Sequence, residues 1–183
     1  MTEAGKWLIL IYKIPAEPSR YRVAVWRRLK ERGAVYLQNS VCVLPDTPAN
    51  RNLFHALAEE IVKAEGESLL LLAEPLGTAA QEKVVGRFNG ERDAEYGEFL
   101  EQCGAFLAEI RRETERRNFT FGELEENEEG LRRLETWLQK IKNRDFFGAM
   151  KAAVAEDYLS QCQQALETFA GRVFLAQEGS GPE

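Results

Sequence analysis

Six basic residues lie within thirteen positions near the start of the chain, and their spacing is the clearest chemical signal in the sequence. They are Arg20, Arg22, Arg27, Arg28, Lys30 and Arg32, and in this stretch only Glu31 opposes them. Positive charge gathered on one short segment can neutralise the phosphates of a polyanion and release the counterions around it. Two hypotheses stay open: a nucleic-acid-binding surface, or a solvated helix face on a chain whose net charge is −6.

A second group of cations could hold a divalent oxyanion such as chromate, because guanidinium groups bind oxyanions through charge-assisted hydrogen bonds. These candidates are Arg111, Arg112, Arg116 and Arg117, in the sequence IRRETERRNF. Acidic residues interleave with them, and a further acidic run follows at residues 123–129. Ion pairs within the chain are therefore the alternative interpretation. A metal site in the acidic run is a weaker alternative, since such runs usually stay solvated and no His or Cys joins this one.

The sequence contains none of the common motifs of nucleophilic catalysis or nucleotide binding. There is no G-x-S-x-G, no P-loop and no G-x-G-x-x-G, and the single histidine, His55, has no evident acid or nucleophile partner. Cys42, Cys103 and Cys162 are odd in number and widely spaced, which favours neither a disulfide framework nor a zinc site. We therefore expect a protein that is not an enzyme and holds no metal or cofactor.

Composition and charge indicate a soluble protein in two parts. The chain has 183 residues, of which 44% are hydrophobic and 30% charged. No apolar run approaches the roughly 20 residues of a membrane span, and the N-terminus lacks the pattern of a signal peptide, so we expect a cytoplasmic protein without a membrane partner. Residues 1–76 carry 10 Lys+Arg and 9 Asp+Glu, whereas residues 77–183 carry 14 and 21. This shift predicts a domain boundary near residues 75–78.

The first part, residues 1–76, predicts the order β-α-β-β-α-β. Gly33 is placed to end the first helix, and Ser19 to cap its start. On that helix Val25, Trp26 and Leu29 are expected to cover a sheet. This order is that of the ferredoxin-like fold, a four-stranded sheet with two helices on one face. The expected strands are residues 6–14, 34–38, 41–44 and 67–73, the last of them buried, and the expected helices are residues 19–32 and 49–64.

The second part, residues 77–178, predicts three amphipathic helices with apolar stripes that begin near Tyr96, Leu131 and Ala153. Such helices pack as an antiparallel bundle. A coiled coil between chains is the alternative. The tail, residues 179–183, is expected to be disordered. The predicted fold class is therefore α+β: a ferredoxin-like domain followed by a helical bundle.

Several separated blocks resemble one known family. WLILIYKIP, YRVAVWRRLKERGAV, LQNSVCVLP, RFNGERDAEYGEFL, FTFGELEENEEGLRRLETWLQKI and RDFF are similar to the N-terminal region of ChrB-type chromate resistance proteins. The resemblance implies a role in chromate resistance, where some members are regarded as chromate-responsive transcriptional regulators. DNA and chromate are then the implied partners. Full-length members carry a further C-terminal domain, which we do not expect within these residues.

A more distant resemblance concerns Y-x-I-P and Q-x-S-V, which are similar to the ferredoxin-like endonucleases of CRISPR adaptation and to the C-terminal domain of PaaX-type repressors. In the nucleases an acidic residue associated with metal follows the strand tyrosine, but Lys13 stands there in this chain. An ammonium group cannot replace a carboxylate on Mg²⁺, so this departure disfavours a metal-dependent nuclease. A plain protein-interaction module remains a third alternative.

Self-association is also expected, because the related folds commonly form dimers and an unpaired sheet edge invites pairing. Residues 69–72 of the last predicted strand are uncharged and would leave such an edge unguarded. The helical bundle could instead cover that edge and leave a monomer.

Overall fold

The computed structural model describes residues 5–178, which fall into two compact units. Within the described residues, the first unit comprises residues 5–92 with Asn143–Ala149, and the second comprises Asp93–Lys142 with residues 150–178. The predicted boundary at residues 76–77 is therefore not where these units divide. The predicted disordered tail, residues 179–183, lies outside the described residues.

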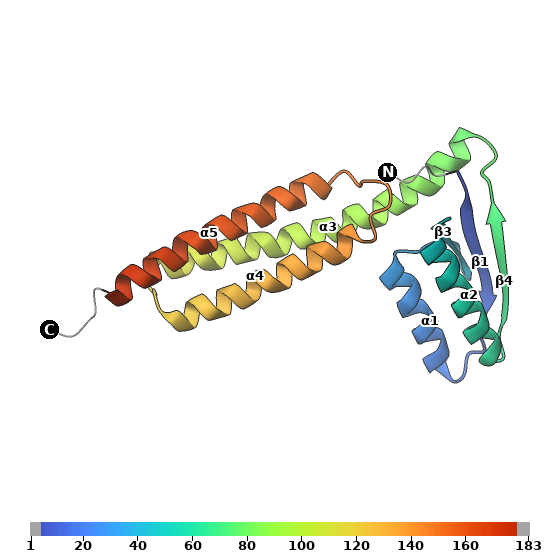
Figure 1. Cartoon of the computed structure of the whole chain (residues 1–183), viewed down its shortest axis with the longest axis horizontal. Coiled ribbons are helices and arrows are strands. Elements are labelled where there is room, and N and C mark those ends of the chain that lie inside the picture. The colour runs from blue at the N-terminus through green and yellow to red at the C-terminus, as the bar shows by residue number, and fades with distance from the viewer. Residues whose placement is uncertain (1–4, 179–183) are drawn as a thin grey trace. The chain divides into compact units, whose positions relative to one another are not determined.

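The first unit has the predicted order β-α-β-β-α-β and forms one antiparallel sheet with the strand order β2-β3-β1-β4. Helices α1 and α2 lie side by side on one face of the sheet (Figure 1). The ferredoxin-like part of the predicted fold class is confirmed. The elements are β1 (Trp7–Lys13), α1 (Ser19–Arg32), β2 (Val35–Gln38), β3 (Val41–Pro45), α2 (Pro48–Lys63), β4 (Glu67–Ala73) and the first turns of α3 (Thr78–Glu115).

The helix-covered face of the sheet holds one half of the core. Ser68 of β4 donates a hydrogen bond to the Ala58 carbonyl of α2 at 3.5 Å, and Ser68 is the register partner of Tyr12 on β1. Because side chains alternate along a strand, Leu8 and Leu10 share this face with Tyr12. Leu10 is fully buried.

The opposite face of the sheet is covered at one end by aromatic side chains. Trp7 stacks on Phe88 of α3 with ring centroids 5.6 Å apart and planes 15° apart. Phe147 lies 5.6 Å from Trp7 and 5.3 Å from Phe88, again between ring centroids. The first turns of α3 and residues 143–149 therefore belong to the core of the first unit, although the sequence pattern assigned both to the helical bundle.

The start of α1 differs from its prediction, whereas its end agrees. Ser19 is the first residue of the helix rather than its cap; the N-cap is Pro18, and no side chain caps the first turn. Gly33 ends the helix with φ +82°, and its N–H approaches the carbonyls of Leu29 and Lys30. Only a residue without a Cβ adopts this conformation at little cost.

Trp26 does not cover the sheet. Val25 and Leu29 are buried, but Trp26 is 50% exposed. Residues four apart lie on one face of a helix, whereas the next residue is turned by about 100°. Val25 and Leu29 therefore form the buried stripe, and Trp26 lies at its border with solvent.

The last strand is not buried as predicted. β4 lies at one edge of the sheet, and Leu69, Leu71 and Leu72 are 53%, 41% and 50% exposed. The run of apolar residues therefore correctly predicts a strand here, but it does not predict whether that strand is buried. The opposite edge strand, β2, is shorter, and its pairing with β3 shifts register between Tyr36 and Gln38.

The second unit contains the rest of α3 together with α4 (Phe121–Lys142) and α5 (Ala152–Glu178). The three helices lie side by side as a bundle (Figure 1), which confirms the second part of the fold class. Across residues 5–178, no helix combines the length and the apolar character that crossing a membrane requires. One part of the bundle core is made by Ile110, Leu124, Leu166, Phe169 and Val173.

We predict that Gly33→Ala lowers the free energy of unfolding by about 2–4 kcal/mol, because the left-handed backbone and an added Cβ are both unfavourable there. That Cβ would lie 2.8 Å from the Cβ of Arg144 and 2.9 Å from Nη1 of Arg92. Urea unfolding followed by circular dichroism measures the change. Gly86→Ala in α3, where an added Cβ meets nothing within 4 Å, is the control and should stabilise by about 0.5–1 kcal/mol. Equal effects of the two substitutions would contradict this account.

Candidate nucleic-acid interface

The six cations predicted on α1 all lie on that helix, but they serve two different purposes. Three of them contact neighbouring elements. Arg28 forms an ion pair with Glu60 of α2. Arg32 donates from Nε to Oδ1 of Asn50 at 2.5 Å, and Nζ of Lys30 lies 3.3 Å from Oε2 of Glu91 on α3. These three side chains connect α1 to the elements beside it.

The other three cations project into solvent. Arg20 stacks on Tyr21, with its guanidinium carbon 4.9 Å from the ring centroid, and donates to the Tyr21 hydroxyl at 3.1 Å. Arg22 and Arg27 are exposed, and within residues 5–178 neither forms an ion pair. Their positive charge is thus not offset by a carboxylate of the first unit, unlike that of Arg28.

The exposed tryptophan belongs to the same basic surface. Arg22, Trp26 and Lys30 are spaced four residues apart, so they follow one side of α1. This side of α1 faces away from α2. The residue that contacts α2 is Arg28, which lies on the other side of the buried stripe formed by Val25 and Leu29. The contact between Lys30 and Glu91 shows that it faces the first turns of α3. We call Arg20, Arg22, Trp26 and Arg27 the α1 surface.

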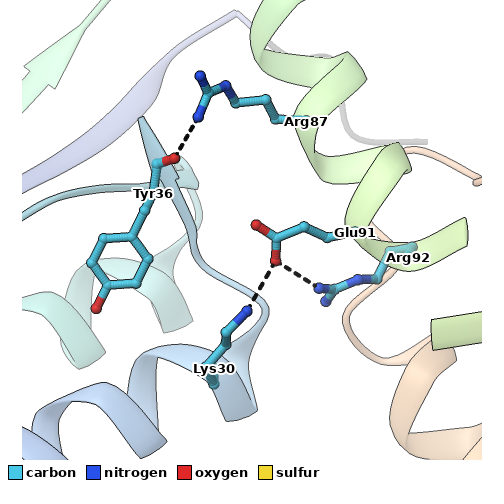
Figure 2. A network of polar contacts seen from close by, with 5 residues as sticks. All are labelled: Lys30, Tyr36, Arg87, Glu91 and Arg92. Carbon is cyan, nitrogen blue, oxygen red and sulfur yellow. Dashed lines mark hydrogen bonds and ion pairs between the residues drawn. The ribbon is translucent and has the colours of Figure 1, made fainter. Parts of the chain in front are cut away.

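A polar network joins α1, the edge strand β2 and α3 (Figure 2). Nη1 of Arg87 donates to the backbone carbonyl of Tyr36 at 2.7 Å. One turn further along α3, Oε2 of Glu91 lies 3.3 Å from both Nζ of Lys30 and Nη2 of Arg92. Arg87 therefore occupies a carbonyl at the outer side of β2, which is one way of protecting a sheet edge.

Arg92 is a structural member of this network. Its side chain is almost fully buried, and its Nη1 lies close to Gly33, at the C-terminal end of α1. The C-terminal end of a helix carries partial negative charge, which favours a cation there. A buried charge that loses its partner costs about 3–5 kcal/mol, so the carboxylate of Glu91 stabilises the first unit through Arg92.

Two tyrosine hydroxyls meet between β1 and β2. The oxygens of Tyr12 and Tyr36 are 2.7 Å apart. Burial raises the pKa of both phenols, and burial also raises the pKa of the neighbouring Cys42 thiol to about 12. These groups are therefore neutral at physiological pH. The next residue on β1, Lys13, is exposed and is the register partner of Glu67.

The second predicted group of cations lies at the end of α3. Arg112 forms an ion pair with Glu109, and Nη1 of Arg116 lies 3.7 Å from Oε1 of Glu113. Both are pairs within one helical turn. Arg111 is exposed, and Arg117 lies beyond the helix in a turn with φ +55°.

The acidic run of α4 pairs with the arginines that follow it, since Glu128 and Glu129 lie 4.0 Å and 3.4 Å from Arg132 and Arg133. The described residues, 5–178, contain no group of three or more His, Cys, Asp or Glu side chains placed to hold a metal ion. The three cysteines are free and buried.

Sequence reasoning missed the contribution of α3 to the first unit. It assigned Arg87, Glu91 and Arg92 to the helical bundle, because the fall in charge after residue 76 suggested a boundary there. A signal was present: Val84 and Phe88 are apolar residues four apart, ahead of the stripe that begins at Tyr96. An apolar helix face that extends beyond the bundle must pack against another element of the chain.

The protein is of the α+β class. The last strand of its ferredoxin-like sheet leads into a helical bundle, and its first helix carries a basic surface. The chain belongs to the ChrB N-terminal family, because the family model described as "Protein ChrB, N-terminal" matches residues 22–180. It is also 27% identical over 94 residues to Protein ChrB of Cupriavidus metallidurans (strain ATCC 43123 / DSM 2839 / NBRC 102507 / CH34). That match covers 51% of this chain and 28% of the relative.

The tyrosine pair generates a prediction about alkaline pH. A phenol whose pKa is raised by folding stabilises the protein fully below its unfolded pKa of about 10, and this contribution is lost as pH rises above that value. We therefore predict that the free energy of unfolding falls above about pH 10 more steeply in the wild-type chain than in Tyr36→Phe. Urea unfolding at a series of pH values measures both slopes. Parallel slopes would show that these hydroxyls titrate alike in the folded and unfolded states.

Proposed function

We propose that this chain is a non-enzymatic regulatory or accessory protein of the chromate-resistance response and that its α1 surface binds nucleic acid. Membership of the ChrB N-terminal family supports the first part. One observation carries the second: Arg22 and Arg27 are exposed and have no carboxylate partner among residues 5–178, and Trp26 is half exposed beside them. Arginine pairs with phosphate oxygens, and an exposed aromatic ring offers a face on which a base can stack.

The charge distribution supports binding of nucleic acid at one local surface rather than a general attraction of nucleic acid to the whole chain. The chain is acidic overall, with a net charge of −6, and all of its acidic excess falls after residue 76. At physiological salt, charges are screened within about 8 Å, so a polyanion would respond mainly to the nearest side chains. Nothing in α1 resembles a helix that reads base edges in a groove, so the proposed binding is governed by phosphate charge.

A metal-dependent nuclease is the competing function, and Lys13 disfavours it. Its exposed ammonium group stands at the end of β1, where the nucleases that this chain resembles carry an acid. A cation at that point repels a divalent metal ion instead of binding it.

We predict that duplex and single-stranded DNA both bind at low salt and that binding weakens steeply as salt is raised. Arg22→Glu combined with Arg27→Glu should reduce the slope of log K against log salt for duplex DNA by about 0.9 for each arginine that contacts a phosphate. Fluorescence anisotropy with a labelled oligonucleotide over a series of salt concentrations measures this slope.

The matched control combines Lys140→Glu with Arg172→Glu, which makes the same change in net charge on exposed positions of α4 and α5. It should leave the slope unchanged. If the two double variants weaken binding equally, net charge governs binding and the α1 surface does not. If the wild-type chain binds no DNA at low salt, the proposed function fails.

We also propose that the chain forms a homodimer through the edge of β4. This edge strand has seven residues and pairs with β1 over its whole length, and its central residues carry no charge. At the other edge, β2 is short and Arg87 holds one of its carbonyls. Unpaired N–H and C=O groups on a long, uncharged edge favour pairing with a second strand, and an antiparallel copy of β4 would place leucine beside leucine.

Sedimentation equilibrium tests this association. We predict a mass that rises with concentration from the chain mass of 20.8 kDa towards about twice that value. Leu71→Lys should shift the equilibrium to the monomer, because an edge lysine disfavours pairing. Val62→Lys, an equally apolar-to-charged change on the exposed side of α2, is the control. A single species at the chain mass across micromolar concentrations would contradict the dimer.

A further inference from the structure

A groove of about 530 Å³ lies in the first unit, between α3 and the strands β2 and β3. Pockets for small ligands usually measure about 300–1,000 Å³, so this one is large enough for a compact organic group. Its lining residues are Leu37, Gln38, Val41, Ala80, Lys83, Val84 and Arg87.

The groove has an apolar floor and a cationic rim. Leu37, Val41 and Val84 supply aliphatic surface, while Lys83 and Arg87 supply positive charge. No acidic side chain lines it. Apolar surface next to fixed cations is complementary to a ligand that joins a flat ring to an anion, since the ring can lie against the aliphatic groups while the anion meets the rim.

Arg87 is held ready for such an anion. Its Nη1 donates to the Tyr36 carbonyl at 2.7 Å, which fixes the guanidinium beside the outer edge of β2. A guanidinium carries five N–H donors, and this hydrogen bond uses one of them. Lys83 lies one turn earlier on α3, about 6 Å away along the helix axis, so the two cations follow the same side of the helix.

The cationic rim of the groove lies one to two turns of α3 from the contact between α3 and α1. Lys83, Arg87 and Glu91 are spaced four residues apart on α3, and Glu91 contacts Lys30 at the end of α1. Figure 2 shows Arg87 at the β2 carbonyl and Glu91 between Lys30 and Arg92. The Arg87–Tyr36 contact and the contacts of Glu91 with Lys30 and Arg92 are thus separated by about one turn of α3 within the first unit.

We propose that this groove binds a nucleoside phosphate, with the base against the apolar floor and the phosphate on Lys83 and Arg87. The inference rests on the proposed nucleic-acid binding. It adds to the α1 surface a second site, in which a base is contacted. The nucleoside phosphate can be one unit of a single strand or a free mononucleotide. Duplex DNA keeps its bases stacked inside the helix, so it can reach only the cationic rim.

The test uses the full chain and compares four probes: labelled oligodeoxythymidylate, the same sequence as a duplex, thymidine monophosphate and inorganic phosphate. Ala80→Phe fills the groove without changing charge, and it should weaken single-strand binding about fivefold, the factor that corresponds to losing roughly 40 Å² of apolar contact between base and floor. Ala79→Phe, at an exposed neighbouring position that does not line the groove, is the matched control and should leave binding unchanged.

Lys83→Gln tests the rim. It should reduce the salt slope for the single strand by about 0.7, the value expected for one lost phosphate contact, whereas Ala80→Phe should leave that slope unchanged. Lys63→Gln, on the exposed last turn of α2, is the charge-matched control. Thymidine monophosphate should compete with the single strand more strongly than inorganic phosphate does, because phosphate lacks the base.

The outcomes separate the two proposals. If single-strand binding depends on Arg22 and Arg27 but ignores both Ala80→Phe and Lys83→Gln, the groove inference is wrong and the proposed function stands. If inorganic phosphate competes as well as the mononucleotide, only the rim binds and the base contact is wrong. If neither strand binds but the mononucleotide does, and Ala80→Phe abolishes this, the groove inference stands and the proposed function fails.

Discussion

The stacking of Trp7 on Phe88 is the contact on which the rest of the first unit depends. Trp7 comes from the central strand β1 and Phe88 from α3, with Phe147 against both rings. Aromatic pairs of this kind bury large areas and add about 0.5–1.5 kcal/mol beyond that burial. Their geometry fixes the first turns of α3 against the sheet. Arg87, the residue before Phe88, is thereby placed at the edge of β2, and Glu91 reaches the end of α1.

The cations of the first unit fall into two groups by their surroundings: those that contact other side chains of the fold and those that are exposed. Arg28 and Arg32 have partners on the neighbouring helix α2, and Arg92 is buried beside Glu91 on its own helix. Substituting any of these three would therefore destabilise the fold and would not test binding alone. Arg22 and Arg27 project into solvent, and their substitution tests binding with little structural cost. An acidic chain can present a basic surface here because its excess of carboxylates lies elsewhere in the sequence.

Much of the fold could be predicted from the sequence, because local signals set its elements. The prolines around the first helix, Gly33 at its end and the short apolar runs gave the order of strands and helices and hence the ferredoxin-like class. What could not be predicted depends on contacts distant in sequence. Trp26 shares an apolar character with Val25 and Leu29, but only the packing shows that it is exposed. The groove joins residues 37–41 to residues 80–87, and no pattern in either segment reveals the other.

We propose that nucleic acid is bound by the face of the first unit that carries Trp26. The chain has three tryptophans, Trp7, Trp26 and Trp137, so its indole N–H groups give three signals in a nitrogen–proton correlation spectrum. Trp26→Phe and Trp137→Phe each identify one of them. Titration with a single-stranded oligonucleotide at low salt should shift the Trp26 signal most and leave that of Trp137, which packs on Phe99 within the helical bundle, in place. A shift of Trp137 while Trp26 stays unchanged, or no shift of any indole signal, would contradict the account.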